Sequence, residues 1–197
     1  MDRTLRVKHR WRSCCACAVL LILCVAGFAQ TKSAPAVDQS DAMLADFGSR
    51  VGKYLQARQK AGGSPKPAKE PEKLVDHRKQ TRAKLRSART TAKQGDIFTP
   101  EIADYFRRQI AATFAGPEGS KIRASLRRAE PVDGIVLEVN AIYPPSVPLQ
   151  STPPTLLLNL PRLPKDLEYR IVGHDLALHD TATNLIVDFI SNAIPAS

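Results

Sequence analysis

The chain has 197 residues and carries 29 Lys and Arg against 19 Asp and Glu, a formal net charge of +10. This length suits one domain or two small ones, and the positive charge favours an anionic partner. All four cysteines lie within residues 1–29. The rest of the chain therefore has no thiol for a disulfide framework, a thiolate zinc site, an iron–sulfur cluster or a cysteine nucleophile.

Residues 1–29 have the features of a cleavable export signal. Five basic residues come first, an apolar run extends from Cys14 to Phe28, and small residues precede Gln30. The run of about fifteen residues is shorter than the roughly 20 that span a bilayer. We expect a mature chain that starts at Gln30, has no transmembrane segment, and is periplasmic or extracellular. An uncleaved anchor and a lipoprotein acylated at Cys24 are the alternatives.

The next segment, residues 30–40, is polar and is predicted to be a flexible lead. Apolar residues at spacings of three and four then predict a first helix that ends before Gly62. A second helix, with a weaker apolar seam, is predicted over about 70–93. Two helices joined by a short loop predict a basic helical hairpin over residues 41–93. The seam of the first helix consists of Leu44, Phe47, Val51, Tyr54, Arg58 and Ala61.

Residues 94–197 are predicted to form an α+β part. Thr99 can cap a third helix that begins at about residue 100, because Pro and Glu follow it. A glycine and a proline at 116–117 end that helix, and a short fourth helix extends to about Arg128. Helices are therefore expected over about 100–128.

Strands are expected over about 134–190. The apolar alternations at residues 135–139 and 156–160 predict two strands, and residues 185–190 predict a last one. Between them, a two-residue turn at Gly173-His174 predicts a hairpin in which Glu168 faces His179. The fold class is thus α+β: a helical hairpin and two shorter helices, followed by an antiparallel sheet of about five strands.

Two His-Asp pairs within residues 174–180 resemble a metal or acid–base site. The register argues against this, because it places the two histidines at opposite ends of one strand. A turn and a cross-strand ion pair are the alternative. Asp188, which is flanked by apolar residues, is read as a functional carboxylate, as a residue on the outward face of an edge strand, or as a hydrogen-bonded core acid. The candidate catalytic residues are His174, Asp175, His179 and Asp188; no metal ligand set, cofactor motif or catalytic signature is found.

Positive charge is concentrated from His77 to Gly95, a segment with seven basic residues and no acidic one. Five of the seven recur at spacings of three and four, which on a helix forms one positive stripe. The stripe is either a solvated or internal docking surface, or a site for an external polyanion. It lacks the interleaved aromatic residues that stack on nucleic-acid bases. The candidate binding residues are Lys79, Arg82, Arg86, Arg89 and Lys93.

Five stretches of the chain carry a resemblance to a known family: residues 94–101, 105–108, 153–158, 163–172 and 184–189. They resemble a family of exported bacterial proteins known only as hypothetical. The likeness covers most of the chain from about Asp46 onward. It implies the same layout of a signal followed by a folded domain, and it implies no activity and no site residue.

Two functional hypotheses follow. The first is a non-enzymatic envelope protein that binds an anionic surface or a protein partner through the basic helix, with no nucleic-acid partner and no cofactor. The second is a periplasmic hydrolase that uses the 174–180 region together with Asp188. The sequence leaves the oligomeric state open, because a hairpin with one weak seam can also pair with a second copy.

Overall fold

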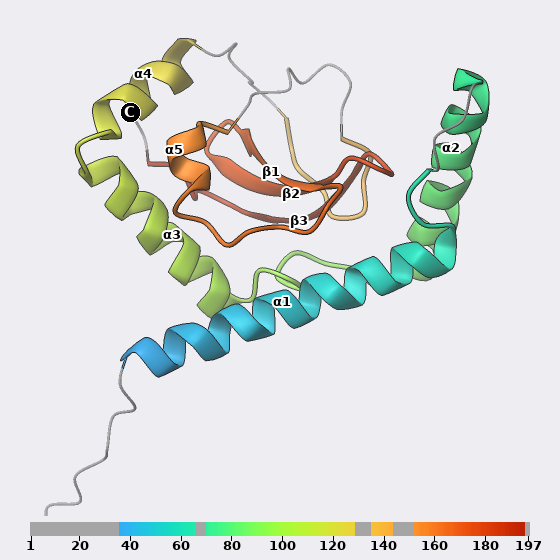
Figure 1. Ribbon diagram of the computed structural model, residues 1–197, viewed down its shortest axis with the longest axis horizontal. Helices are drawn as coiled ribbons and strands as arrows, with labels where there is room; N and C mark the ends of the chain where they lie inside the picture. The colour runs from blue at the N-terminus through green and yellow to red at the C-terminus, as the bar shows by residue number, and fades with distance from the viewer. Residues whose placement is uncertain (1–35, 66–69, 129–134, 144–151, 196–197) are drawn as a thin grey trace, which may run out of the picture. The chain divides into compact units, whose positions relative to one another are not determined.

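The computed structural model describes residues 36–65, 70–128, 135–143 and 152–195. The expected export signal, and with it every cysteine, lies outside these ranges. Residues Ala34–Ser197 form one compact unit, which is α+β: helices come first and an antiparallel sheet comes last (Figure 1). The elements are α1 (Ala36–Ala61), α2 (Pro71–Ala88), α3 (Pro100–Ala115), α4 (Gly119–Arg128), α5 (Pro154–Leu157), β1 (Leu167–Val172), β2 (Asp175–Asp180) and β3 (Leu185–Ile190).

The predicted hairpin is confirmed in its turn and in its register. β1 and β2 are antiparallel, with Val172 opposite Asp175 and Glu168 opposite His179. Gly173 has a φ of 59°, in the left-handed region that glycine tolerates best. β3 continues the sheet in the order β1-β2-β3. A bulge between Leu178 and His179 shifts the pairing of β2 with β3.

The sheet buries both of its faces. Tyr169, Ile171, Leu176 and Leu178 lie on the face that packs against α1, α3 and α5, as the predicted register requires. The opposite face packs a second cluster, to which Leu137 contributes from outside the sheet. Because both faces are covered, residues that alternate along a strand enter two different cores.

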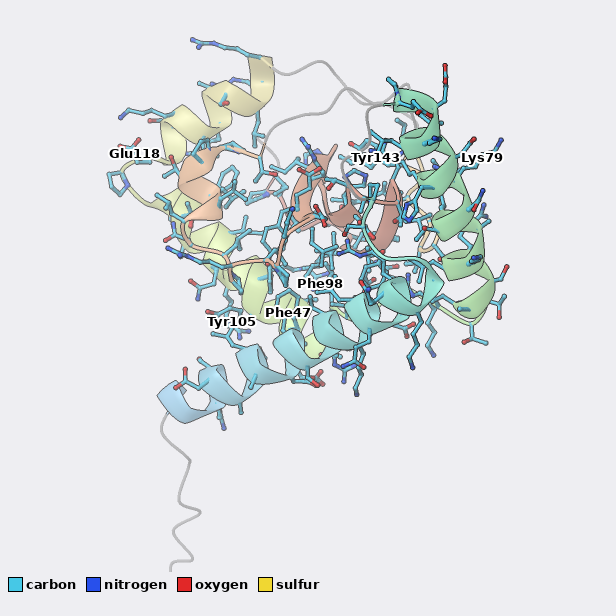
Figure 2. The ribbon with its side chains drawn as sticks, turned by 45° about the vertical axis from the view of Figure 1, so that its right-hand side comes forward. Phe47, Lys79, Phe98, Tyr105, Glu118 and Tyr143 are labelled. Carbon is cyan, nitrogen blue, oxygen red and sulfur yellow. The ribbon has the colours of Figure 1, made fainter. Side chains whose placement is uncertain are left out.

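Aromatic rings occupy the centre of the larger core. Phe106 is fully buried, and its ring centroid lies 5.3 Å from Phe47, 5.2 Å from Phe98 and 5.8 Å from Tyr169. Phe47 and Phe98 lie side by side between α1 and the start of α3 (Figure 2). These contacts join the helices to β1, because tilted and edge-on ring pairs of this kind pack closely.

The structure has three strands in its described residues where about five were predicted. Residues 156–160 were expected to form a strand, but they form the helical turn α5 and the turn after it. Pro154 suits the first helical position. Leu156 and Leu160 are buried and Leu158 is 84% exposed, which is the spacing of a helix. The alternation of leucines was therefore misleading.

The strand expected at residues 135–139 is also absent. Leu137 is buried and Val136 is exposed, so the alternation itself is present. The chain then turns, with Asn140 at a φ of 67°, and its backbone N–H donates to the Ile186 carbonyl. Only a short stretch around Ile142 then pairs with β3 as an isolated bridge. The turn interrupts the regular spacing that a strand ladder needs.

The two helices of the predicted pair contact each other, and α2 crosses the C-terminal part of α1 (Figure 1). α1 starts at Ala36, inside the segment that the sequence assigns to the lead. α2 ends at Ala88 and not near Lys93, because its C-cap Arg89 leaves the helical conformation with φ −123° and ψ 36°. Lys93 therefore does not belong to the helical stripe.

α3 and α4 lie where the sequence predicts them. The Thr99 side chain accepts a hydrogen bond from the Ile102 N–H, at 3.4 Å, which is the predicted cap. α3 ends at Gly116, and a tight turn leads into α4. The turn brings Gly119 against the carbonyl of Phe114, so that a Cβ on this glycine would overlap that backbone.

We expect Gly119→Ala to lower the free energy of unfolding by about 1–3 kcal/mol, the usual cost of overpacking. Gly116→Ala is the matched control, because its added Cβ would lie 3.4 Å from the nearest atom and its φ of −75° suits alanine. The control is expected to change stability by less than about 0.5 kcal/mol. Urea denaturation of both variants measures the difference, and equal losses would contradict the expected overlap.

Candidate functional site

Arginines of the basic helix α2 and the residues just after it contact β3, the end strand of the sheet, and the turn before β3. An end strand presents backbone carbonyls that need partners. Arg89 Nη2 donates to the Val187 carbonyl at 3.3 Å, and Gln94 Nε2 donates to the Phe189 carbonyl at 3.2 Å. Arg82 Nη1 makes a longer contact of 3.5 Å with the Thr183 carbonyl. Two of the five predicted binding residues, Arg82 and Arg89, therefore face the sheet.

Arg89 is part of the packed structure. Its guanidinium lies 4.8 Å from the centre of the Tyr54 ring, in the geometry of a cation–π contact. Burial lowers the pKa of Arg89, and neighbouring Tyr54 opposes that shift. Among the described residues, its buried Nη1 has no hydrogen-bond partner. Arg89 thus holds α2 against α1 and β3, as an internal docking surface would.

Lys79, Arg86 and Lys93 form the other part of the predicted stripe, and all three are exposed. Lys79 points away from the sheet (Figure 2). Within the ranges that the structure describes, none of the three makes an ion pair with a carboxylate. We call these three residues the exposed stripe. Their charges are directed to solvent and are not neutralised by the fold.

His179 is buried and both of its ring nitrogens have partners. Nδ1 lies 2.8 Å from Glu168 Oε1, which confirms the cross-strand contact, and Nε2 lies 2.9 Å from Asn184 Oδ1. The ring of Tyr143 packs over it, with centroids 4.8 Å apart. A histidine held in this way has no free nitrogen to act as a base or as a metal ligand.

His174 and Asp175 lie at the hairpin turn, at the other end of β2. The exposed ring of His174 places Nδ1 3.2 Å from the Ile194 carbonyl. The carboxylate of Asp175 accepts the Asn192 N–H at 2.9 Å. Both side chains therefore bind backbone groups of the C-terminal segment, which is the role of turn residues.

Asp188 is a fully buried acid that accepts backbone hydrogen bonds. Its carboxylate receives the N–H groups of Gly95, Ile97 and Phe98 at 2.8–3.0 Å and that of its neighbour Phe189 at 2.8 Å. Burial raises the pKa of Asp188, while these four donors oppose the rise. The carboxylate thus anchors the loop between α2 and α3 to β3.

The four candidate catalytic residues do not meet. Asp188 lies opposite Leu178 on the face of the larger core, whereas His179 packs with Tyr143 on the other face. His174 is at the far end of the hairpin. No group of three or more histidine or carboxylate side chains in the described residues has a geometry that could hold a metal ion.

Sequence reasoning missed a buried polar cluster around Asp180, the last residue of β2. Its carboxylate accepts a hydrogen bond from the Tyr54 hydroxyl at 2.6 Å, from Arg58 Nη1 at 2.9 Å and from the Ala182 N–H at 2.9 Å. Burial raises the pKa of Tyr54, and the adjacent carboxylate raises it further, so the phenol stays protonated and donates. Asp166 lies 3.6 Å from Arg58 and completes the cluster. The cluster joins α1 to the sheet, because Tyr54 and Arg58 belong to α1 and Asp180 belongs to β2.

A cavity of about 510 Å³ lies beside β1. Its charged lining includes Glu168 and Arg170, which pair with each other at 2.6 Å. Glu168 also holds His179. Two of the three charged residues that line this cavity are therefore engaged, and the third, Arg162, is exposed.

Comparison with protein-family models, curated proteins and solved structures finds no match to the chain. The functional argument therefore rests on the side chains themselves. Among the described helices, none combines the length and the hydropathy needed to cross a membrane.

Proposed function

We propose that the protein is an exported, non-enzymatic binding protein that attaches to an anionic phospholipid surface through the exposed stripe. Export is supported by the basic, apolar and small-residue pattern of residues 1–29. The observation that carries the binding proposal is that Lys79, Arg86 and Lys93 are exposed and have no carboxylate partner in the described residues.

The surroundings of the stripe support the same proposal. The segment from His77 to Gly95 contains no acidic residue that would repel a negatively charged surface. Arg82 contacts the turn before β3 and Arg89, at the end of α2, contacts β3, so the helix is fixed when its outer side meets a partner. Prior fixation lowers the entropy lost on binding. Val75, which is 60% exposed, adds an apolar contact on the same side of the helix.

The expected binding free energy is large enough to be measured. A Lys or Arg close to an anionic membrane surface contributes about 1 kcal/mol. Removing the three charges of the exposed stripe is therefore expected to weaken attachment by about 100-fold. Like charges on one helix each cost about 0.2–0.5 kcal/mol, and an anionic surface would relieve that repulsion.

The test compares two variants of equal net charge in a vesicle sedimentation assay. One variant reverses the exposed stripe (Lys79→Glu, Arg86→Glu, Lys93→Glu), and the other reverses three exposed arginines of α3 and α4 (Arg108→Glu, Arg127→Glu, Arg128→Glu). Both are made in residues 30–197, which include the whole compact unit. The vesicles are an equal mixture of phosphatidylglycerol and phosphatidylcholine.

We expect the stripe variant to lose binding by at least about 100-fold and the control variant to lose much less. Equal losses would mean that attachment depends on net charge alone and would contradict the assignment to α2. Unchanged binding of the stripe variant would reject the proposal and direct attention to a protein partner.

A further inference from the structure

A second group of unpaired positive charges lies in a groove between α1 and α2. The groove has a volume of about 330 Å³. At 3.6 residues per turn, Lys84 in this groove is about 140° around the helix from Lys79 of the exposed stripe. The groove and the stripe are therefore on different sides of α2. The groove is lined by Lys53, Gln56, Ala57, Lys60, Ala61, Lys84 and Ala88.

The lining of the groove has three lysines and no acidic residue. On a helix, a side chain three or four positions away is the usual partner of a charge. Every such neighbour of Lys53, Lys60 and Lys84 is neutral or basic. None of the three makes an ion pair within the part of the chain that the structure describes. Three exposed lysines thus line one groove without a carboxylate partner among the described residues.

Small side chains keep the groove open. Ala57 and Ala61 of α1 and Ala88 of α2 line it, and Ala61 is only 7% exposed. A larger residue at these positions would fill the space between the helices. Gln56 contributes an amide, which can donate a hydrogen bond to an anionic oxygen. The volume is at the lower end of the roughly 300–1,000 Å³ of ligand pockets, which suits a small ligand.

We propose that this groove binds a compact phosphate group of two or more negative charges, such as a phosphate monoester or a diphosphate. Lysine binds phosphate as a point charge, and three ammonium groups can contact different oxygens of one ligand. A singly charged carboxylate would leave two of the three lysines unneutralised. The phosphate can come from a lipid headgroup or from a free soluble compound. This site is separate from the stripe and goes beyond the proposed attachment.

The test measures binding of inorganic pyrophosphate to residues 30–197 by isothermal titration calorimetry. The groove variant is Lys53→Gln, Lys60→Gln, Lys84→Gln. The control variant, Lys73→Gln, Lys121→Gln, Lys165→Gln, removes the same charge at exposed lysines outside both the groove and the exposed stripe. We expect the groove variant to raise the Kd for pyrophosphate at least about tenfold and the control variant to raise it less than about twofold.

A second measurement identifies the source of the phosphate. Phosphatidylcholine vesicles that contain either phosphatidic acid or phosphatidylglycerol, at matched surface charge, are added to the same three proteins, and the preference for phosphatidic acid over phosphatidylglycerol is measured. If the protein binds pyrophosphate and has no preference for phosphatidic acid, the groove binds a soluble phosphate compound. If it has a preference that only the groove variant loses, the groove binds a lipid headgroup. If the wild-type protein does not bind pyrophosphate, or if both variants weaken binding equally, the groove is not the phosphate site. Neither result decides on the exposed stripe, because both kinds of vesicle are anionic and the stripe residues are unchanged in all three proteins.

Discussion

Replacing Asp180 by alanine is expected to lower the free energy of unfolding by about 3–5 kcal/mol, the loss that follows when one partner of a buried ion pair is removed. Asp180 is fully buried and accepts hydrogen bonds from Tyr54, Arg58 and the Ala182 N–H. Without it, the Arg58 guanidinium stays buried with its nearest remaining carboxylate, that of Asp166, 3.6 Å away. Urea denaturation of the variant measures the loss.

Asp166→Asn is the matched control for this prediction, because asparagine tolerates the left-handed backbone of this position, where φ is 69°. Its side chain is 21% exposed, and its contact with Arg58 is longer than that of Asp180. A partly exposed pair of this kind contributes about 1 kcal/mol or less. A loss in Asp180→Ala no larger than that in Asp166→Asn would show that the buried cluster does not join α1 to the sheet.

Asp188→Ala is the second variant with a large expected loss, about 3 kcal/mol or more. The substitution removes the acceptor of four backbone N–H groups, of which those of Ile97 and Phe98 are buried. Each buried donor without a partner costs about 1–3 kcal/mol. We also expect faster hydrogen exchange at the amides of Ile97 and Phe98, because the loop between α2 and α3 loses its anchor.

Asp175→Ala tests the same residue type at a less buried position. Its carboxylate accepts one hydrogen bond, from the exposed Asn192 N–H, so we expect a loss of about 1 kcal/mol. If Asp188→Ala and Asp175→Ala were equally stable, or if exchange at Ile97 and Phe98 did not change, Asp188 would not be the anchor of the loop.

The hairpin was predicted in detail because the residues that determine its register are close together in the sequence. A glycine at 173 and the alternation on either side define one register, and that register is the one observed. The cap at Thr99 is also a local signal, and it is present. Local patterns of this kind are sufficient where turn chemistry and side-chain alternation agree.

Two of the expected strands were wrong because alternation alone does not specify a strand. Leucines at 156, 158 and 160 alternate, but Pro154 starts a helical turn that buries the first and the last of them. Residues 135–139 alternate as well, yet the turn at Asn140 leaves them without a ladder. A short apolar run can be assigned to a helix or a strand only when its flanking residues are considered as well.

The buried cluster required information that is not local. Arg58 lies on the predicted apolar seam of the first helix, and a charge in such a position needs a buried partner. That signal was available, but the partner Asp180 is 122 residues away. The sequence offers 19 acidic residues, and their distances from Arg58 depend on the packing of α1 against the sheet. Periodicity does not determine that packing.

The basic stripe was predicted as one surface, and the structure divides it. Arg82 and Arg89 face β3, while Lys79 and Arg86 face solvent on α2 and Lys93 lies beyond the helix. The division follows from the weak apolar seam of α2. That seam has few large apolar residues, so the aliphatic parts and the guanidinium groups of two arginines complete the contact with the sheet.

The central claim is that the exposed stripe attaches the protein to an anionic phospholipid surface. The most direct measurement is sedimentation of residues 30–197 with phosphatidylglycerol-containing and pure phosphatidylcholine vesicles at about 0.01 M and about 1 M salt, where the Debye length falls from about 30 Å to about 3 Å. We predict binding to the anionic vesicles at low salt that is lost at high salt, with no binding to the neutral vesicles. Failure to bind anionic vesicles at low salt, or equal binding to both kinds, would contradict the claim.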